Sequence, residues 1–330
     1  MPTLDDLHET YEELAQSHVD GVAGVRLLGD GNGKTVIVSC MTHGNEPCGL
    51  AFIRYLLLHP DVAARIRGTL IVSINNLEGA RRFFAAATPE ERKKARVLDA
   101  NMNRLPTDAP KSASTAYELQ RFAQLYPIFQ RAEAGLDLHS FPADGPPMII
   151  DVKGDASAIE RVSDPLPVTV WVKGITQHQE GHPIGWFYGG AGSDVPVFEV
   201  ECGVHLDPAA FDTAVRSGLA YLVGLGMLDL PHATELRMQD VFHVQKSIHF
   251  PNLSYELLRL YDNFDVIAEG EIIATGDDGD IVADREYRAL FGRRTVRFTQ
   301  QEEIAFEITW LTDPPVHRQK KQIVFDALDV

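Results

Sequence analysis

The sequence predicts a two-domain α/β protein. Residues 1–232 are expected to form a three-layer α/β/α domain with a largely parallel sheet, and residues 233–330 a smaller, mainly β domain. In the first part, apolar β-branched runs alternate with helical patterns, as in proteins that cover a parallel sheet on both faces. After about residue 232, short strand-like runs and glycine turns replace this alternation. A chain of 330 residues is also longer than one hydrophobic core usually serves.

The predicted elements follow in chain order. An amphipathic pattern within residues 1–20 predicts a short opening helix. Apolar runs predict strands at residues 35–40, 69–74, 134–138 and 195–201. Helical patterns cover residues 49–59, 115–133 and 211–227. In the second domain, strands are predicted at residues 264–267, 271–274 and 304–310, with a turn at 275–280.

A glycine-rich stretch, Leu28-Gly29-Asp30-Gly31-Asn32-Gly33-Lys34-Thr35, superficially matches a phosphate-binding loop. That motif needs glycine where this chain has Leu28, and a helix must follow it. A β-branched strand pattern follows instead, so we interpret the stretch as a hairpin turn.

The composition narrows the class of partner. The formal net charge of −17 argues against nucleic acid and against an anionic membrane, since both are bound by clustered Lys and Arg. The three cysteines, Cys40, Cys48 and Cys202, are an odd number without CxxC spacing, which favours a reducing compartment. The N-terminus lacks the pattern of a signal peptide. We therefore expect a cytoplasmic protein that acts on a small molecule, with its oligomeric state, a homo-oligomer included, left open.

Three residues are candidate metal ligands. His43 and Glu46 follow the predicted strand that ends at Cys40, and His139 lies at the end of the strand that begins at Ala134. Sites in open α/β sheets gather beyond the carboxyl ends of the strands, so these side chains can converge. Two histidines and a carboxylate are a typical ligand set for catalytic zinc, although Co²⁺ and Mn²⁺ are also accepted. Asp137 shares a face with His139 and is expected to orient its imidazole.

The last strand of this domain carries two carboxylates, Glu199 and Glu201, on one face. Zinc lowers the pKa of a bound water to about 7, where a carboxylate can accept its proton. Glu201 lies nearer the carboxyl end and is the favoured base. Glu199 is its rival, or binds a cation below the site.

A cationic pocket is predicted around residues 96–104. Arg104 beside Asn103 offers a planar fork and an amide, which suit a substrate carboxylate, and Arg96 offers a second guanidinium.

The ordered set His43-Gly44-Asn45-Glu46, Arg96 with Asn103-Arg104, Asp137-Leu138-His139 and Glu201-x-Gly203 resembles the succinylglutamate desuccinylase/aspartoacylase family, which is related to the zinc carboxypeptidases. The resemblance in order and approximate spacing covers residues 35–205. The pattern Phe264-x-x-Ile267-x-x-Gly270-Glu271 is similar to the second domain of that family.

This resemblance implies a zinc-carboxypeptidase-like fold and hydrolysis of an N-acyl amino acid. It implies one zinc ion bound by His43, Glu46 and His139, with Glu201 as base and then acid. The substrate carboxylate would be held by Asn103, Arg104 and Arg96, with His178 lining the pocket. The chain departs from the family at Asn101, where aspartate is common, and at Phe141, where a small hydroxyl residue is common. Both departures bear on the choice of substrate.

Two alternatives remain open at this point. One is a zinc carboxypeptidase that removes a C-terminal residue from a peptide, which needs a more open cleft. The other is a metal- or ligand-binding module without catalysis, for which a residue such as Glu201 would have no use.

Overall fold

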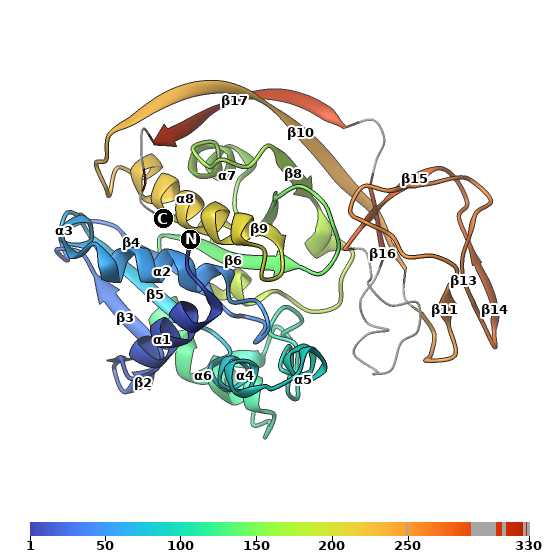
Figure 1. The fold of residues 1–330 in the computed structure, drawn as a ribbon, viewed down its shortest axis with the longest axis horizontal. Coiled ribbons are helices and arrows are strands. Elements are labelled where there is room, and N and C mark those ends of the chain that lie inside the picture. Colours follow the sequence, from blue (N-terminus) through green and yellow to red (C-terminus); the bar gives the residue numbers. More distant parts are fainter. Residues whose placement is uncertain (249, 292–307, 312–314, 326–327, 329–330) are drawn as a thin grey trace.

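The computed structural model describes residues 1–248, 250–291, 308–311, 315–325 and 328, with helices on both faces of a central sheet (Figure 1). The helices are α1 (Leu4–Ala15), α2 (Cys48–Leu58), α3 (Pro60–Ala63), α4 (Leu77–Ala85), α5 (Pro89–Lys94), α6 (Tyr117–Phe129), α7 (Ala156–Ser163) and α8 (Pro208–Gly224), with 3-10 turns η1 (Ala109–Lys111), η2 (Ile175–Gln177) and η3 (Ile184–Phe187). Of the helices described, none is long and apolar enough to cross a membrane.

The strands of the first part of the chain are β1 (His18–Val19), β2 (Val22–Ala23), β3 (Val25–Leu28), β4 (Thr35–Cys40), β5 (Thr69–Ile74), β6 (Ala134–Phe141), β7 (Met148–Lys153), β8 (Val170–Lys173) and β9 (Val197–Val204). The later strands are β10 (His232–Ile248), β11 (Glu256–Leu257), β12 (Val266–Ile267), β13 (Ile272–Gly276), β14 (Gly279–Val282), β15 (Tyr287–Leu290), β16 (Ile308–Leu311) and β17 (Val316–Phe325).

The central part of the sheet has the strand order β3-β5-β4-β6-β9-β7-β8-β10. The pairs β4/β5, β4/β6 and β6/β9 are parallel, whereas β7 runs antiparallel to β9. The strands β4, β6 and β9 therefore end at the same edge of the sheet. This edge is where the sequence places its candidate ligands.

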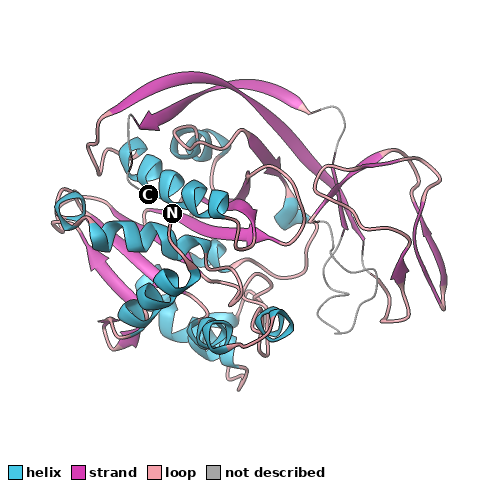
Figure 2. Cartoon of the chain, viewed as in Figure 1, coloured by secondary structure: helices cyan, strands magenta, loops and turns pink. Residues whose placement is uncertain are grey.

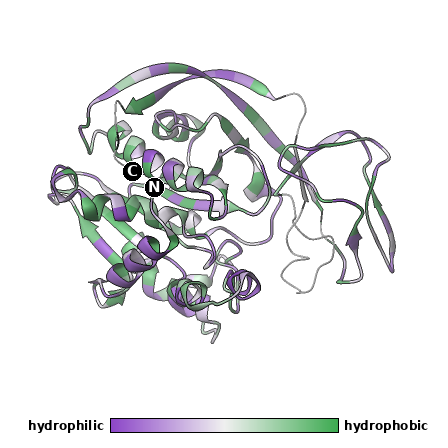
Figure 3. Ribbon diagram, viewed as in Figure 1, coloured by the Kyte–Doolittle hydropathy of each residue, from purple (hydrophilic) through white to green (hydrophobic). Residues whose placement is uncertain are grey.

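Alternating side chains along these strands enter two different apolar cores. Val36 and Val38 of β4 face a core shared with α1, α2, α7 and α8, whereas Ile37 faces one shared with α6 and η3. Figure 2 shows the resulting layers, and Figure 3 shows hydrophobic segments concentrated in the strands between them. The three-layer prediction is confirmed.

The C-terminal part is mainly β, as predicted, and is joined to the central sheet by one strand. The long β10 pairs in parallel with β8, and antiparallel with β17 and β16. It continues as a curved ribbon toward the C-terminal strands (Figure 1). There, β11, β13 and β14 form a separate small sheet. Ile248, Tyr261 and Ile273 belong to the core of this region.

The predicted strands at 35–40 and 69–74 coincide with β4 and β5, and the predicted helices correspond to α2, α6 and α8 with shifted ends. The hairpin interpretation of residues 28–35 is wrong in its pairing. The flanking strands β3 and β4 do not pair with each other, because β5 lies between them. Of the strand predicted at 304–310, the structure describes residues 308–310, within β16, and residues 304–307 lie outside the described part.

Candidate metal centre and adjoining cavity

The loop between β4 and α2 carries His43 and Glu46. It is held close to its surroundings at Gly44, whose backbone N–H donates to the Arg96 carbonyl oxygen at 3.0 Å. A Cβ at Gly44 would lie only 2.2 Å from the Ala95 carbonyl oxygen, so the packing of this loop requires glycine. The loop therefore places both side chains at the carboxyl edge of the sheet, where they are almost fully buried.

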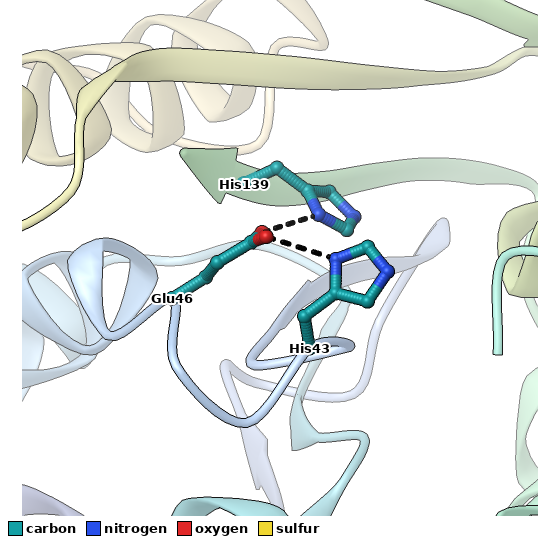
Figure 4. Close-up of side chains that lie close together, drawn as sticks. All are labelled: His43, Glu46 and His139. Atoms are coloured by element: carbon teal, nitrogen blue, oxygen red, sulfur yellow. Dashed lines mark hydrogen bonds and ion pairs between the residues drawn. The ribbon is translucent and has the colours of Figure 1, made fainter. Parts of the chain in front are cut away.

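His139, near the end of β6, faces the same point (Figure 4). Its Nδ1 lies 2.8 Å from Oε2 of Glu46, and Nδ1 of His43 lies 3.0 Å from Oε1 of the same carboxylate. The His43 contact lacks hydrogen-bond geometry, so this buried nitrogen has no hydrogen-bond partner among the described residues. The sequence prediction that these three residues converge agrees with the structure.

The far nitrogens of both imidazoles meet oxygen acceptors. Nε2 of His139 lies 2.9 Å from Oδ2 of Asp137, and Nε2 of His43 lies 3.1 Å from Oδ1 of Asn101. An acceptor at Nε2 favours a ring proton there and leaves Nδ1 as the atom that can bind a metal; at His43 this acceptor competes with the Arg96 guanidinium, whose Nη2 lies 3.3 Å from the same Nε2 and can only donate. Two Nδ1 atoms facing one carboxylate fit the ligand chemistry of zinc.

The electrostatics of His43 and Glu46 are consistent with ligation. Burial, together with the Arg96 guanidinium, lowers the pKa of His43 to about 4 and keeps its ring neutral. Burial opposes the charge on Glu46, but His43 and Arg96 hold the pKa of this carboxyl well below its usual range. A neutral imidazole and an ionised carboxylate are the forms that bind metal.

Asp137 is held by several donors. Its Oδ1 accepts from the Ser39 hydroxyl at 2.7 Å, and its Oδ2 accepts from the Thr42 hydroxyl at 2.6 Å. The Ser39 hydroxyl in turn lies 2.6 Å from the Tyr188 hydroxyl. Burial disfavours the charge of His139, yet the Asp137 carboxylate and its hydrogen bond raise the pKa of this imidazole. Asp137 thus fixes the orientation of His139, as predicted from its place two residues earlier on the strand.

Glu199 and Glu201 lie on the same sheet face as His139 and are also buried, with 5% and 7% exposure. Glu201 pairs in register with His139, and Glu199 with Asp137, one step further from the strand ends. Burial raises the pKa of Glu201 well above its usual value, opposed by His139 and reinforced by Glu46. Burial likewise raises the pKa of Glu199 to about 7.

A cavity of about 460 Å³ opens beside these groups. Its walls are largely apolar, which the sequence did not predict. The apolar lining residues are Phe83, Pro89, Phe141, Pro142, Ile150, Val152, Ile175, Pro183, Leu206 and Phe291. The polar part includes His43, Glu46, Glu199 and Glu201, together with the cationic side chains of Arg92, Lys93, Arg96 and Arg104.

The predicted carboxylate-binding residues take different places. Asn103 and Arg104 both line the cavity, and the Arg104 guanidinium donates to the Asn103 carbonyl oxygen at 2.7 Å. Arg96 lines it too, but its guanidinium is paired with the Glu46 carboxylate and so lies against the ligand group. His178 caps η2 and is not among the lining residues, although its neighbours Thr176 and Gln179 are.

His205 is a further polar residue of the site. The structure places it in the cavity wall, with Nδ1 2.8 Å from the hydroxyl of Ser140. Burial lowers the pKa of His205 to about 4, so the ring is neutral. The only sequence signal was its position just after β9, because the Ser140 contact depends on the packing of two strand ends.

Known proteins were compared with this chain by sequence and by structure. Residues 32–144 match the sequence model of the succinylglutamate desuccinylase/aspartoacylase catalytic domain. This segment contains His43, Glu46, Asn103, Arg104 and His139, whereas Glu199 and Glu201 lie beyond it. The family match confirms the resemblance inferred from the sequence. No curated protein matches the chain in sequence.

Solved structures share the fold over nearly the whole chain. Succinylglutamate desuccinylase from Vibrio parahaemolyticus has 15% identity and a TM-score of 0.60, covering 92% of this chain and 90% of that chain. Murine aminoacylase 3 has 18% identity and a TM-score of 0.55, covering 90% and 99%. A product-bound ectoine utilization protein from Ruegeria pomeroyi has 15% identity and a TM-score of 0.58, covering 91% and 93%. At these identities the likeness establishes the fold.

Proposed function

We propose that the chain is a zinc-dependent hydrolase that cleaves the amide bond of an N-acyl amino acid. The observation that carries this proposal is the convergence of two imidazole Nδ1 atoms on one buried carboxylate, with the Glu201 carboxyl beside them in register with His139. The match of residues 32–144 to a family of deacylases supports the reaction class.

In this proposal, His43, Glu46 and His139 hold one zinc ion. When bound, zinc polarises the acyl carbonyl and makes the attacking water more acidic. Glu201 accepts the proton of that water as its oxygen bonds to the acyl carbon, and delivers the proton to the amide nitrogen as the C–N bond breaks. Burial raises its pKa above the usual carboxyl value, which makes the ionised carboxylate a stronger proton acceptor.

Asn103 and Arg104 are assigned to the substrate carboxylate, since both line the cavity. Arg96 is assigned to the same region, where its charge also stabilises ionised Glu46. His178 contributes only through the segment that places Thr176 and Gln179 in the wall.

The test is release of free amine from a panel of Nα-acyl amino acids with acidic, neutral and basic side chains, together with a dipeptide. The protein is assayed as purified, after chelation, and after zinc is restored, with metal content measured in parallel. We expect turnover of an acyl amino acid that is lost on chelation and recovered with zinc. Faster cleavage of the dipeptide would favour a carboxypeptidase. Zinc at full occupancy with ligand binding and no product would favour a binding module.

A further inference from the structure

Two neighbouring carboxylates on the site face of the sheet are partnered very differently. Asp137 on β6 and Glu199 on β9 lie opposite each other in register. Asp137 accepts hydrogen bonds from two hydroxyl groups and contacts the His139 imidazole. Across the described residues, the Glu199 carboxylate forms no hydrogen bond or ion pair, and its Oε1 is fully buried without a partner.

An unpartnered buried carboxylate destabilises a fold, because the charged group loses its hydration without gaining donors. An apolar or hydroxyl side chain at this position would destabilise the fold less. Glu199 also lines the cavity through the small exposed part of its side chain, although Oε1 itself is fully buried. A ligand in the cavity is therefore expected to offset the charge of this carboxylate.

Three other buried oxygens of residues that line the cavity also lack hydrogen-bond donors. Asn45 Oδ1, Asn103 Oδ1 and Glu201 Oε2 are buried hydrogen-bond acceptors without partners in the described part of the chain. A ligand that satisfies these acceptors must bring hydrogen-bond donors or positive charge, whereas the buried Nε of Arg92, which also lines the cavity without a partner among the described residues, needs an acceptor. A ligand with a second carboxylate here would instead face Glu199 and Glu201.

The surroundings of Glu199 suit an aliphatic stem that carries such a charge. Its register partner on β7 is Ile150, and Val152 of the same strand and Ile175 also line the cavity. Long cationic side chains bury their methylene groups along apolar walls while the charged end reaches a polar partner. The cavity thus pairs an apolar wall with an anionic end formed by Glu199 and Glu201. It is lined as well by the cationic side chains of Arg92, Lys93, Arg96 and Arg104.

This anionic end is on the side that would hold the amino acid part of the substrate. Asn103 and Arg104 line the same cavity as Glu199, and the Arg104 charge is near enough to influence the Glu199 carboxyl. We place the substrate carboxylate at Asn103 and Arg104, with the side chain of the same amino acid, rather than its acyl group, directed toward Glu199.

Building on the proposed deacylase function, we propose that Glu199 binds the ammonium group at the end of the substrate's amino acid side chain. The substrate class is then the Nα-acyl derivatives of basic amino acids, and Glu199 is the residue that determines specificity. N-acyl derivatives of aspartate and glutamate are disfavoured, because their side-chain carboxylates would lie against like charges.

The experiment compares Nα-acetylornithine with Nα-acetylnorleucine, whose side chain has nearly the same shape but no charge, and with Nα-acetylglutamate. With zinc restored, kcat/KM is expected to favour the ornithine derivative over the norleucine derivative by at least about 10-fold. In Glu199→Gln this ratio is expected to fall by about 10-fold or more. Glu180→Gln is the matched control, because Glu180 is exposed and does not line the cavity.

A second readout does not depend on turnover. Calorimetry should show that the zinc-loaded protein binds ornithine more tightly than norleucine, and that this preference disappears in Glu199→Gln. Glu199→Asp covers the case in which Glu199→Gln does not fold. It retracts the carboxylate by one methylene group and should shift the preference from ornithine toward lysine.

The outcomes separate the two proposals. Hydrolysis of acidic or neutral substrates with a ratio unchanged in Glu199→Gln overturns the assignment of Glu199 and leaves the deacylase function standing. Absence of hydrolysis, with ornithine binding that depends on Glu199, overturns the deacylase function and leaves the binding assignment standing. Equal binding of ornithine and norleucine by the unmodified protein overturns the assignment of Glu199.

Discussion

The ligand group and the Glu199 end of the same cavity differ in how their polar atoms are partnered. At the ligand group, the far nitrogens of His43 and His139 meet Asn101 and Asp137, and Asp137 is itself held by hydroxyl groups. The Glu199 carboxylate, which has an oxygen within 4.8 Å of ligand atoms of Asp137 and His139, has no such hydrogen-bond support among the described residues. The hydrogen bonds around the ligand group fix its geometry before a ligand binds. In our proposal, Glu199 gains a charged partner only when a ligand binds.

The largest expected effect comes from Glu201→Gln, which removes the proposed general base that lies between the ligand group and Glu199. Loss of the general base should reduce kcat by about 10³-fold, because the amide cannot accept the proton of the attacking water. Zinc content should remain near that of the unmodified protein, since Glu201 is not a proposed ligand. A near-normal rate in Glu201→Gln, together with a large loss in Glu199→Gln, would transfer the role of base to Glu199.

The second prediction concerns stability and pH in the metal-free protein. Burial raises the pKa of Glu199 from 4.5 to about 7, so folding favours its protonated form. This contribution is fully present below pH 4.5 and is lost as the pH rises through about 7, which amounts to roughly 3 kcal/mol. Glu199→Gln should remove this part of the pH dependence.

Denaturant unfolding of both proteins at several pH values measures the difference. The unfolding free energy of Glu199→Gln relative to the unmodified protein should increase between pH 4.5 and 7. Glu180→Gln, a Glu-to-Gln change at an exposed position outside the cavity, is the control for the substitution itself. Parallel curves for Glu199→Gln and the unmodified protein would show that Glu199 is stabilised in its charged form by a partner in solution.

The third prediction tests the supported region. Asp137→Asn replaces the acceptor of the His139 ring proton and should weaken zinc binding by about 10- to 100-fold. Competition with a chelator measures this change. Asp240→Asn is the control, since Asp240 forms an exposed ion pair with His317 far along the chain. Equal zinc affinity in both variants would mean that Asp137 does not orient the ligand.

The smallest effect is expected from Asn101→Asp. A carboxylate acceptor at Nε2 makes an imidazole ligand more basic, so zinc affinity should rise by a few-fold. The hydrogen bond from the Asn103 backbone N–H to the side chain at 101 can be kept by aspartate. Weaker zinc binding in this variant would indicate that the neutral amide is needed to balance nearby Glu46.

The parts of the structure that depend on local sequence were predictable. The strands β4 and β5 are continuous β-branched or apolar runs, and their ends match the prediction. The short strands β7 and β8 were missed, because β7 contains Asp151 and Lys153 and β8 has only 4 residues. The pairing of β3 with β5 rather than β4 depends on contacts between distant segments, which a turn motif does not reveal.

In the candidate site, too, features set by local sequence were predictable, and features set by contacts between distant segments were not. The meeting of His43, Glu46 and His139 could be predicted, since parallel strands bring their carboxyl ends to one edge. The contact of Arg96 with Glu46 could not, because it depends on how the loop after α5 folds over the ligand group. The lack of a partner for Glu199 Oε1 could not be predicted either, because it depends on how all the neighbouring side chains pack.

The pairing of β10 with β8 has a consequence for shortening the chain. Residue 232, where the composition changes, is also where β10 begins. A chain cut there would leave β8 with β7 on one side and open N–H and C=O groups on the other. Exposed strand edges of this kind recruit other strands and promote aggregation. The cavity would also lose Phe291 from its wall, so the C-terminal segment protects both the solubility of the sheet and the shape of the site.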